Sequence, residues 1–266
     1  MAREQITRIA LIGYGAIAHE VVTRSARNNR VEIVGALVLE EDLGKPAGFP
    51  LTCDGDALFA FKPDLVVECA GHAAVDAYAA PVLKRGLDLM IVSIGALAER
   101  EREERIRAAA FAAPGQLYLP AGALIGVDGL GAAKRAGLSQ VSLTSRKPPL
   151  AWSGAPGVDG RDLDAIDRAT SIFSGSAREA ALAFPKNANV AATAALAGLG
   201  FDRTDVQLVA DPGVTGNRHC LEFSGACGQY RVETDGRASE DNPKTSMLTA
   251  YSILRAIENR SDALVI

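Results

Sequence analysis

A short glycine turn near the start, Gly-Tyr-Gly-Ala-Ile-Ala at residues 13–18, constrains the fold more than any other part of this sequence. It follows an apolar run, residues 9–12, and leads into a helical pattern. In that context a G-x-G-x-x-(G/A) pattern predicts a dinucleotide site. Gly13 permits the tight turn, Gly15 lets a pyrophosphate approach the backbone, and Ala18 allows close helix–strand packing. The alternative is an ordinary βα turn that happens to contain glycines.

The same turn indicates which residues bind the coenzyme. Backbone N–H groups at the start of a helix attract phosphate, so the binding candidates are Gly13, Gly15, Ala16 and Ile17. An acidic residue roughly 20 positions later usually binds the ribose 2′-hydroxyl. Glu40 is the nearest acid, slightly late, and no Arg or Lys stands beside it to favour a 2′-phosphate. This favours NAD over NADP, although Glu40 could equally be a solvated loop charge, so both coenzymes stay open.

The first half of the chain alternates apolar runs with helix-length segments. Such alternation indicates βαβ units and a doubly wound parallel sheet, a Rossmann-type α/β fold. The runs are apolar throughout rather than alternating, as expected for strands covered on both faces. We expect strands at 7–12, 32–39, 65–68, 89–93 and 116–119, and helices at 19–27, 73–85 and 98–113.

Two loops that follow predicted strands are candidates for contact with the coenzyme. Ligands of open α/β sheets bind outside the carboxyl ends of the strands. Small residues there let a cofactor lie against the backbone, which selects Ala70 and Gly71 after one strand and residues 93–97 after the next. His72 either starts a helix or contacts the ligand directly.

The alternation of apolar runs and helical segments ends near Pro120. We expect a dinucleotide-binding domain at 1–119 and a substrate and catalytic α+β domain at 120–242, with a C-terminal helix at 243–266 packing back on the first. The second domain should combine helices with an antiparallel sheet. Its expected helices are 127–136, one capped by Ser176 with Glu179, one ending near Gly198, and one whose apolar face carries Met247, Leu248, Tyr251, Leu254 and Ile257. Its expected strands are 140–145, 206–210, 218–224 and 229–233, followed by a turn at Asp235-Gly236.

Composition excludes several classes of protein. The 266 residues carry a net charge of −4, so no electrostatic footprint for nucleic acid is present. The four cysteines are scattered without a C-x-x-C pair, which makes reduced thiols a better interpretation than a metal site. No apolar stretch approaches the ~20 residues that span a bilayer, and no signal peptide is visible. We therefore expect a cytoplasmic protein without a metal or membrane partner. Separately, we expect a homo-oligomer, a dimer.

Chemistry in the second half centres on His219, which opens a strand beside a glycine-rich turn. A histidine with a pKa of ~6.5 can exchange a proton at neutral pH, although a structural histidine is the alternative. Lys186 with two nearby asparagines could hold a carboxylate or a nicotinamide amide, or could simply cap a helix. The pair Arg146-Lys147 is either an anion site or a solvated pair, and Lys244 stands at another helix start.

Several blocks together resemble the L-aspartate dehydrogenase family. The most specific is residues 184–193, Phe-Pro-Lys-Asn-Ala-Asn-Val-Ala-Ala-Thr. The others are 68–72 (Glu-Cys-Ala-Gly-His), 93–97 (Ser-Ile-Gly-Ala-Leu), 120–126 (Pro-Ala-Gly-Ala-Leu-Ile-Gly), 175–180 (Gly-Ser-Ala-Arg-Glu-Ala), 210–212 (Ala-Asp-Pro) and 242–246 (Asn-Pro-Lys-Thr-Ser). Their order and number cover essentially the whole chain.

The resemblance implies oxidation of L-aspartate with NAD(P)⁺ to iminoaspartate, which hydrolyses to oxaloacetate and ammonia and can feed NAD biosynthesis. It implies a catalytic role for His219 and cofactor contacts at Ala123 and Asn189. Lys186 and Lys244 are then the candidates for the substrate carboxylates. The alternatives are a reductase of the dihydrodipicolinate-reductase or homoserine-dehydrogenase kind and a non-enzymatic protein that senses NAD(H).

Overall fold

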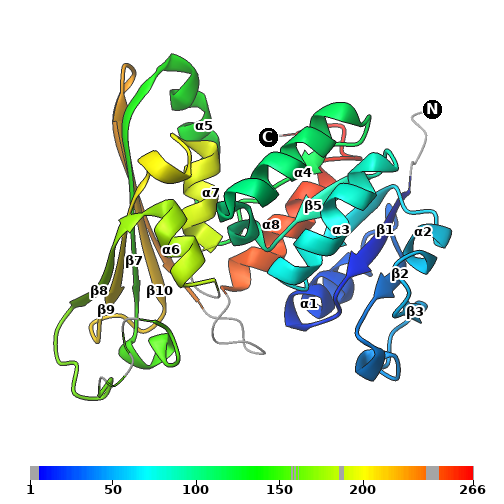
Figure 1. Ribbon diagram of the computed structural model, residues 1–266, viewed down its shortest axis with the longest axis horizontal. Coiled ribbons are helices and arrows are strands. Elements are labelled where there is room, and N and C mark those ends of the chain that lie inside the picture. Colours follow the sequence, from blue (N-terminus) through cyan, green and yellow to red (C-terminus); the bar gives the residue numbers. More distant parts are fainter. Residues whose placement is uncertain are drawn as a thin grey trace. The chain divides into compact units, whose positions relative to one another are not determined.

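The structure, a computed structural model, describes residues 6–156, 158, 160, 162–185, 189–237 and 246–265. The chain divides into two compact units (Figure 1). The first comprises Met1–Ala96, Arg100–Pro120 and Ala250–Ile266, and the second comprises Leu97–Glu99 and Ala121–Thr249.

The first unit is built on a six-stranded parallel sheet of order β3-β2-β1-β4-β5-β6. This is the doubly wound order, in which the strand sequence reverses between β1 and β4 and leaves a crevice there for a ligand. Its elements are β1 (Thr7–Ile12), α1 (Ala16–Ser25), β2 (Val31–Leu37), β3 (Leu51–Thr52), α2 (Ala57–Ala60), β4 (Leu65–Glu68), α3 (His72–Lys84), β5 (Asp88–Ile91), α4 (Arg100–Ala112), β6 (Leu117–Tyr118) and α8 (Met247–Glu258). Short 3₁₀ turns add η1 (Glu40–Asp42) and η2 (Ile94–Ala98).

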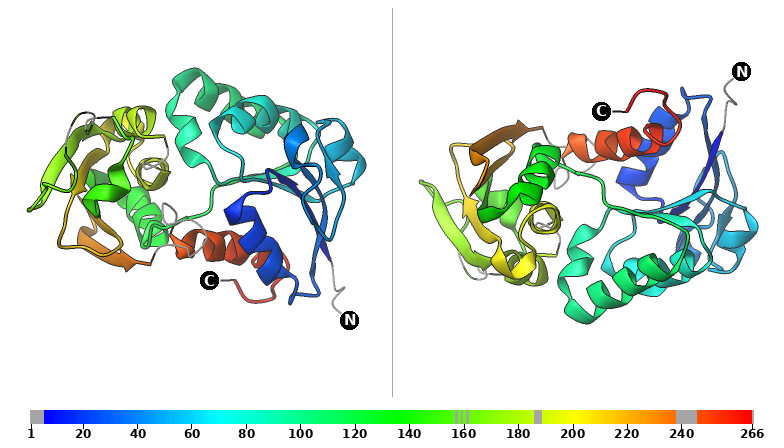
Figure 2. Two further views of the ribbon diagram at one scale, coloured as in Figure 1. Left: turned by 90° about the horizontal axis from the view of Figure 1, so that it is seen from below. Right: turned by 90° about the horizontal axis from the view of Figure 1, so that it is seen from above.

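Helices cover both faces of this sheet, which is why its strands read as continuous apolar runs. Figure 2 shows α3 and α4 on one side, and α1 with the C-terminal α8 on the other. α8 packs through Ala250, Ile253, Leu254 and Ile257 into the core that also contains Ile9. Arg24 of α1 lies 4.6 Å from the ring centroid of Tyr251. The last helix is therefore an integral part of the first unit.

The predicted apolar face of α8 is partly wrong. Leu248 and Tyr251, placed on that face, are 37% and 40% exposed, whereas Ile253 is fully buried. Leu254 and Ile257 are buried as expected. Tyr251 instead lies under the guanidinium of Arg24, where a partly exposed aromatic ring gains a cation–π contact.

The second unit pairs a five-stranded sheet, β11-β10-β7-β9-β8, with helices on one face (Figure 1). Its elements are α5 (Val127–Ala136), β7 (Leu138–Lys147), η3 (Pro149–Trp152), β8 (Thr170–Ser176), α6 (Ala177–Ala183), α7 (Asn189–Ala197), η4 (Phe201–Arg203), β9 (Asp205–Ala210), β10 (Asn217–Gly225) and β11 (Gly228–Gly236). Helices α5, α6 and α7 contact the sheet through β7 to β10. The burial of β7 alternates accordingly, with Val141, Leu143 and Ser145 buried on the helix side.

This sheet is mixed rather than antiparallel as predicted, since β7 and β9 run parallel. The reason is β8, a strand rich in Ser and Gly that the sequence pattern did not indicate; it pairs with β9 from the outside. The predicted turn at Asp235-Gly236 is also wrong. Both residues belong to β11, which pairs with β10 over nine positions up to Asn217. The capping box is confirmed: Glu179 N–H donates to Ser176 Oγ, and Glu179 Oε2 accepts from Ser176 N–H.

Candidate active site

The glycine turn after β1 is held in a conformation that only glycine adopts easily. Gly13 has φ +89°, and its N–H donates to Leu37 O at 2.8 Å. A Cβ built on Gly13 would lie 2.7 Å from the Cβ of Ala70. The turn after β1 and the loop after β4 therefore touch at the point where the strand order reverses.

The start of α1 is open in the manner that a pyrophosphate requires. Gly15 is the N-cap residue and offers no side-chain hydrogen bond to the helix, and a Cβ built on it would meet no atom within 4 Å. The first N–H groups of a helix carry its positive dipole end. Ala16 and Ile17 begin α1, three residues earlier than the predicted start at 19. These residues fit a dinucleotide coenzyme.

Glu68, at the end of β4, organises the neighbouring loops, although no sequence pattern selected it as a site residue. Its carboxylate is 1% exposed. Oε1 accepts from the N–H groups of Ala70 and Gly71 at 2.7 Å each and from the Ser93 hydroxyl at 3.0 Å. Oε2 accepts from Ser93 N–H at 3.0 Å. Burial raises the pKa of Glu68, and these hydrogen bonds oppose the shift.

His72 begins α3, after Gly71 with φ +118°. Its Nε2 is buried and has no hydrogen-bond partner within the part of the chain that the structure describes. Burial, and to a lesser extent the charge of Arg102, lowers the pKa of His72. A ring nitrogen without a partner among the described residues, close in sequence to Ala70, is consistent with the predicted ligand contact, because buried polar atoms normally have a partner.

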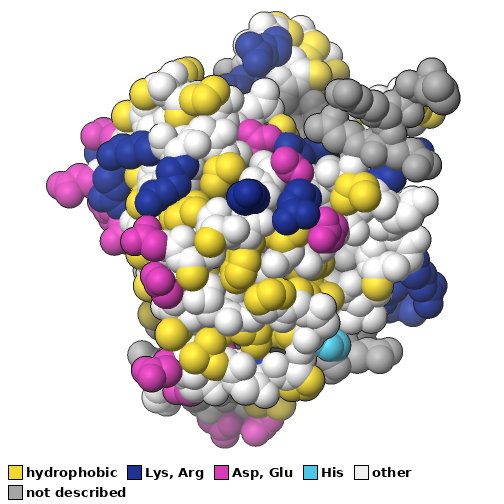
Figure 3. All heavy atoms as spheres, turned by 90° about the vertical axis from the view of Figure 1, so that its right-hand side faces the viewer, with side chains coloured by type: hydrophobic (Ala, Val, Ile, Leu, Met, Phe, Trp, Pro, Cys, Tyr) yellow, Lys and Arg dark blue, Asp and Glu magenta, His cyan; other side chains and the backbone are white. Residues whose placement is uncertain are grey.

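The acidic end of β2 matches the expectation for a ribose-binding position only loosely. Glu40 lies in the exposed 3₁₀ turn η1, three residues beyond the end of the strand. The nearest following lysine, Lys45, forms an ion pair with Asp42 at 2.8 Å. On the face of the molecule drawn in Figure 3, basic and acidic side chains are interspersed.

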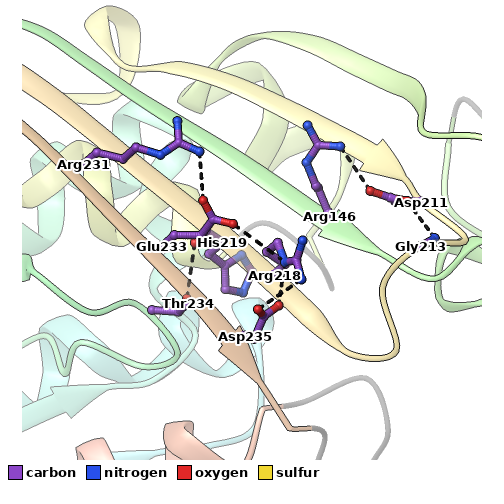
Figure 4. Close-up of polar contacts among 9 residues, drawn as sticks. All are labelled: Arg146, Asp211, Gly213, Arg218, His219, Arg231, Glu233, Thr234 and Asp235. Atoms are coloured by element: carbon purple, nitrogen blue, oxygen red, sulfur yellow. Dashed lines mark hydrogen bonds and ion pairs between the residues drawn. The ribbon is translucent and has the colours of Figure 1, made fainter.

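In the second unit, His219 lies on β10 with its ring buried among the helix-side residues of the sheet. It is 4% exposed, and its Nδ1 is 2.9 Å from Ser145 Oγ on the adjacent strand β7. Its backbone carbonyl accepts a hydrogen bond from the Thr234 hydroxyl on β11 at 3.4 Å (Figure 4). Burial, together with the positive charge of Lys147, lowers the pKa of His219 to about 4, so the imidazole is neutral at pH 7.

The adjacent residues Arg146 and Lys147 point to opposite faces of β7. Arg146 forms an ion pair with Asp211 at 3.1 Å (Figure 4). Lys147 is 4% exposed, shares the face of Ser145, and has its Nζ 5.2 Å from the ring centroid of Trp152. The two residues are therefore not a solvated pair, and Lys147 is a buried cation close enough to act on His219.

Ion pairs line the other face of β10 and β11. Figure 4 shows Arg218 paired with Asp235 at 2.6 Å and Arg231 paired with Glu233 at 2.8 Å. These side chains alternate along the strands with His219 and Thr234, so they lie on the side away from the helices. The sheet thus separates a buried histidine on one face from a partly exposed ladder of charges on the other.

The remaining site predictions fall on loops and helix starts. Ala123 lies in the loop before α5, next to Gly122 with φ +64°, and Asn189 is the first residue of α7, where its carbonyl accepts from the Thr193 hydroxyl at 3.1 Å. Lys186 and Lys244 lie outside the described residues. The structure brings Gly13 and Ala70 together, and it joins Ser145 to His219.

The described residues also bear on metal binding and on membrane spanning. No group of three or more His, Cys, Asp or Glu side chains among them could hold a metal ion. None of their helices is long and apolar enough to cross a membrane.

Comparison with known proteins matches both halves of the chain. Residues 128–260 match the family described as aspartate dehydrogenase, C-terminal. Residues 13–120 match the NAD-binding domain of homoserine dehydrogenase.

Individual relatives extend over almost the whole chain. An L-aspartate dehydrogenase of Cupriavidus taiwanensis is 42% identical over 97% of this chain and 99% of its own. One from Ralstonia nicotianae is 50% identical over 77% of this chain and 76% of its own. The crystal structure of aspartate dehydrogenase from Thermotoga maritima superposes with a TM-score of 0.78 at 28% identity, covering 98% of this chain and 99% of that one.

Proposed function

Since this chain belongs to the L-aspartate dehydrogenase family and is an NAD(P)-dependent oxidoreductase, we propose that it oxidises L-aspartate at its amine-bearing carbon, with His219 as the catalytic residue. The observation that carries the role of His219 is its environment. The imidazole is buried, neutral at pH 7, and bonded through Nδ1 to a serine hydroxyl.

In the overall reaction, L-aspartate, NAD(P)⁺ and water give oxaloacetate, ammonium, NAD(P)H and a proton. The nicotinamide, when bound, accepts the hydride from the substrate α-carbon. The amine must lose a proton before its lone pair can help to expel that hydride and form the imine, which water then hydrolyses. The protein therefore has to bind two carboxylates and to accept a proton.

His219 is in the state that accepts a proton, because a pKa of about 4 leaves this buried imidazole neutral at pH 7. Such a low pKa also makes it a weak base, and the carboxylates of a bound substrate raise that pKa towards the working pH, where proton transfer is most effective. The nearby charge of Lys147 disfavours the imidazolium, so the proton is released again after the reaction. Lys147 also adds a positive potential that favours a substrate with two carboxylates over one with a single carboxylate.

The coenzyme contacts proposed in the first unit are Gly13, Gly15, Ala16, Ile17, Ala70, Gly71 and His72. Three observations support them: the open N-terminus of α1, the contact between the turns after β1 and β4, and the Nε2 of His72, which has no partner among the described residues. Ala123 and Asn189 join them on the strength of the family pattern. Lys186 and Lys244 remain the predicted holders of the substrate carboxylates.

The test is coenzyme reduction, followed by absorbance at 340 nm, with L-aspartate, L-glutamate, L-alanine and L-homoserine, each with NAD⁺ and NADP⁺. We expect turnover with L-aspartate to exceed that with the other three. A preference for homoserine, or reduction of a dihydrodipicolinate-type substrate without oxidation of aspartate, would identify the rival reductase. Binding of NADH without turnover of any amino acid would identify a sensor.

Some predictions concern the cellular setting. The family resemblance implies a supply of iminoaspartate to NAD biosynthesis, and a cytoplasmic location remains the expectation from the sequence. A homodimer is the expected assembly, measurable by size-exclusion chromatography with light scattering.

A further inference from the structure

Ser145 lies directly opposite His219, and the pairing of their two strands places it there. The two residues are register partners in the antiparallel pairing of β7 with β10. Their side chains point to the same face of the sheet, where Ser145 is fully buried and His219 is 4% exposed. Directly opposed side chains in an antiparallel pair are close enough to interact, and here Oγ and Nδ1 are 2.9 Å apart.

The two ring nitrogens of His219 differ in their partners. Nδ1 has the hydroxyl of Ser145. Nε2 has no hydrogen bond to any residue of the described ranges, which leave out 186–188 and 238–245. Nε2 is thus the nitrogen that remains for a substrate, and the partner of the other nitrogen decides whether Nε2 carries a hydrogen.

We propose that Ser145 is a positioning residue: its hydroxyl oxygen accepts the Nδ1–H of His219 and so keeps the Nε2 lone pair free to take the amine proton of the substrate. This inference rests on the proposed catalytic role of His219. A neutral imidazole has one N–H, and a base at Nε2 needs that hydrogen on Nδ1. A hydroxyl suits the task because it can accept the Nδ1–H of both the neutral ring and the imidazolium.

With this tautomer the proton moves from the substrate to Nε2. One N–H bond of the substrate ammonium breaks, its electron pair stays on the amine nitrogen, and the proton joins Nε2. His219 becomes an imidazolium that still donates through Nδ1–H to Ser145. No heavy atom of the pair has to move, so the ring keeps its orientation throughout the transfer.

The tautomer can be read directly by ¹⁵N NMR of histidine-labelled protein, because the sequence contains only three histidines. The substitution His219→Gln assigns the signal by removing it. At pH 7 we expect the wild-type His219 to carry its hydrogen on Nδ1. We expect Ser145→Ala to move it to Nε2, and Ser145→Thr, which keeps the hydroxyl, to restore Nδ1–H.

Steady-state kinetics supply the second readout. Ser145→Ala should lower kcat for L-aspartate by about 10- to 100-fold, the range found for groups that orient metal-bound histidines, with little change in KM. Ser145→Thr should recover most of the rate. Ser142→Ala is the matched control, because Ser142 lies on the same strand, β7, with its side chain on the opposite face.

Each outcome decides one claim. Nε2–H in the wild-type protein overturns the role of Ser145, and this measurement needs no variant to fold. An unchanged kcat and tautomer in Ser145→Ala also overturns it. Full activity of His219→Gln overturns the proposed catalytic role instead, whatever the tautomer of the wild-type ring.

Discussion

Glu68 in the first unit and His219 in the second are both ionisable side chains buried to at least 96%, yet their surroundings differ. The carboxylate of Glu68 accepts four hydrogen bonds, three from backbone N–H groups and one from a hydroxyl. The ring of His219 has one hydrogen bond to a described residue, from or to Ser145, and a cation nearby.

The difference indicates a structural role for Glu68 and a chemical role for His219. A buried carboxylate whose acceptor sites are occupied fixes the loops that bond to it, and Glu68 ties the loop after β4 to the loop after β5. A buried imidazole with one nitrogen left over can still exchange a proton. This contrast supports the proposed roles, in which the first unit binds the coenzyme and the second supplies the base.

The largest expected effect is the loss of kcat when His219 is replaced, which tests the proposed role of the second unit. His219→Gln should lower kcat with L-aspartate by about 10²- to 10⁴-fold, the usual contribution of a general acid or base. The affinity for NADH, measured by fluorescence titration, should not change. Cys220→Ala, at the next position of β10 and on its other face, is the matched control and should retain the wild-type kcat. A rate for His219→Gln equal to that of Cys220→Ala would remove His219 from the mechanism.

The next effect is the dependence of stability on pH, to which His219 and Glu68 contribute with opposite signs. The pKa of His219 falls from 6.5 to about 4 on folding, so its contribution to stability is present above pH 6.5 and is lost as the pH falls towards 4. The loss amounts to about 3 kcal/mol, since one pKa unit corresponds to about 1.4 kcal/mol. Glu68 has the opposite sign: its pKa is raised, so its contribution is lost as the pH rises.

Urea unfolding of the wild-type protein and of His219→Gln between pH 7 and pH 4 measures this term. The free energy of unfolding of the wild type should fall by about 3 kcal/mol relative to that of His219→Gln as the pH falls from 7 to 4, because only the wild type takes up a proton at this position when it unfolds. Curves that stay parallel over this range would show that His219 is not buried in its neutral form.

The sequence predicted the first unit better than the second for a physical reason. The turn at Gly13 and Gly15 and the apolar strands are local signals, and the parallel order follows from them. The pairing of Ser145 with His219 joins residues 74 positions apart, and it depends on the register of two strands. No local pattern specifies that register.

The sequence nevertheless contains a signal for the residues that were missed. Glu68 ends an otherwise apolar strand, which is unusual for a carboxylate unless it is hydrogen-bonded. The period-two pattern of β7 puts Ser145 and Lys147 on the same face as Val141 and Leu143, so a polar and a charged side chain interrupt a buried stripe. Polar residues at core positions of a strand are the signal that could have selected them.

The smallest expected effect tests the scaffold. Glu68→Gln keeps the shape of the side chain and one acceptor oxygen, which can still serve Ala70 and Gly71. Its amide nitrogen then faces the N–H of Ser93, so one buried donor loses its acceptor. We expect the free energy of unfolding to fall by about 1–3 kcal/mol and the Kd for NADH to rise, with kcat at saturating coenzyme close to the wild-type value.

Glu32→Gln is the control that makes this result specific, because Glu32 lies on β2 of the same sheet and pairs with Arg8 at 2.9 Å while its side chain is 51% exposed. An exposed pair of this kind contributes at most about 1 kcal/mol. If Glu68→Gln binds NADH and unfolds in urea as Glu32→Gln does, the four hydrogen bonds of Glu68 do not hold the coenzyme loops. If kcat falls while the affinity for NADH is kept, Glu68 takes part in the reaction itself, and the division between scaffold and base is wrong.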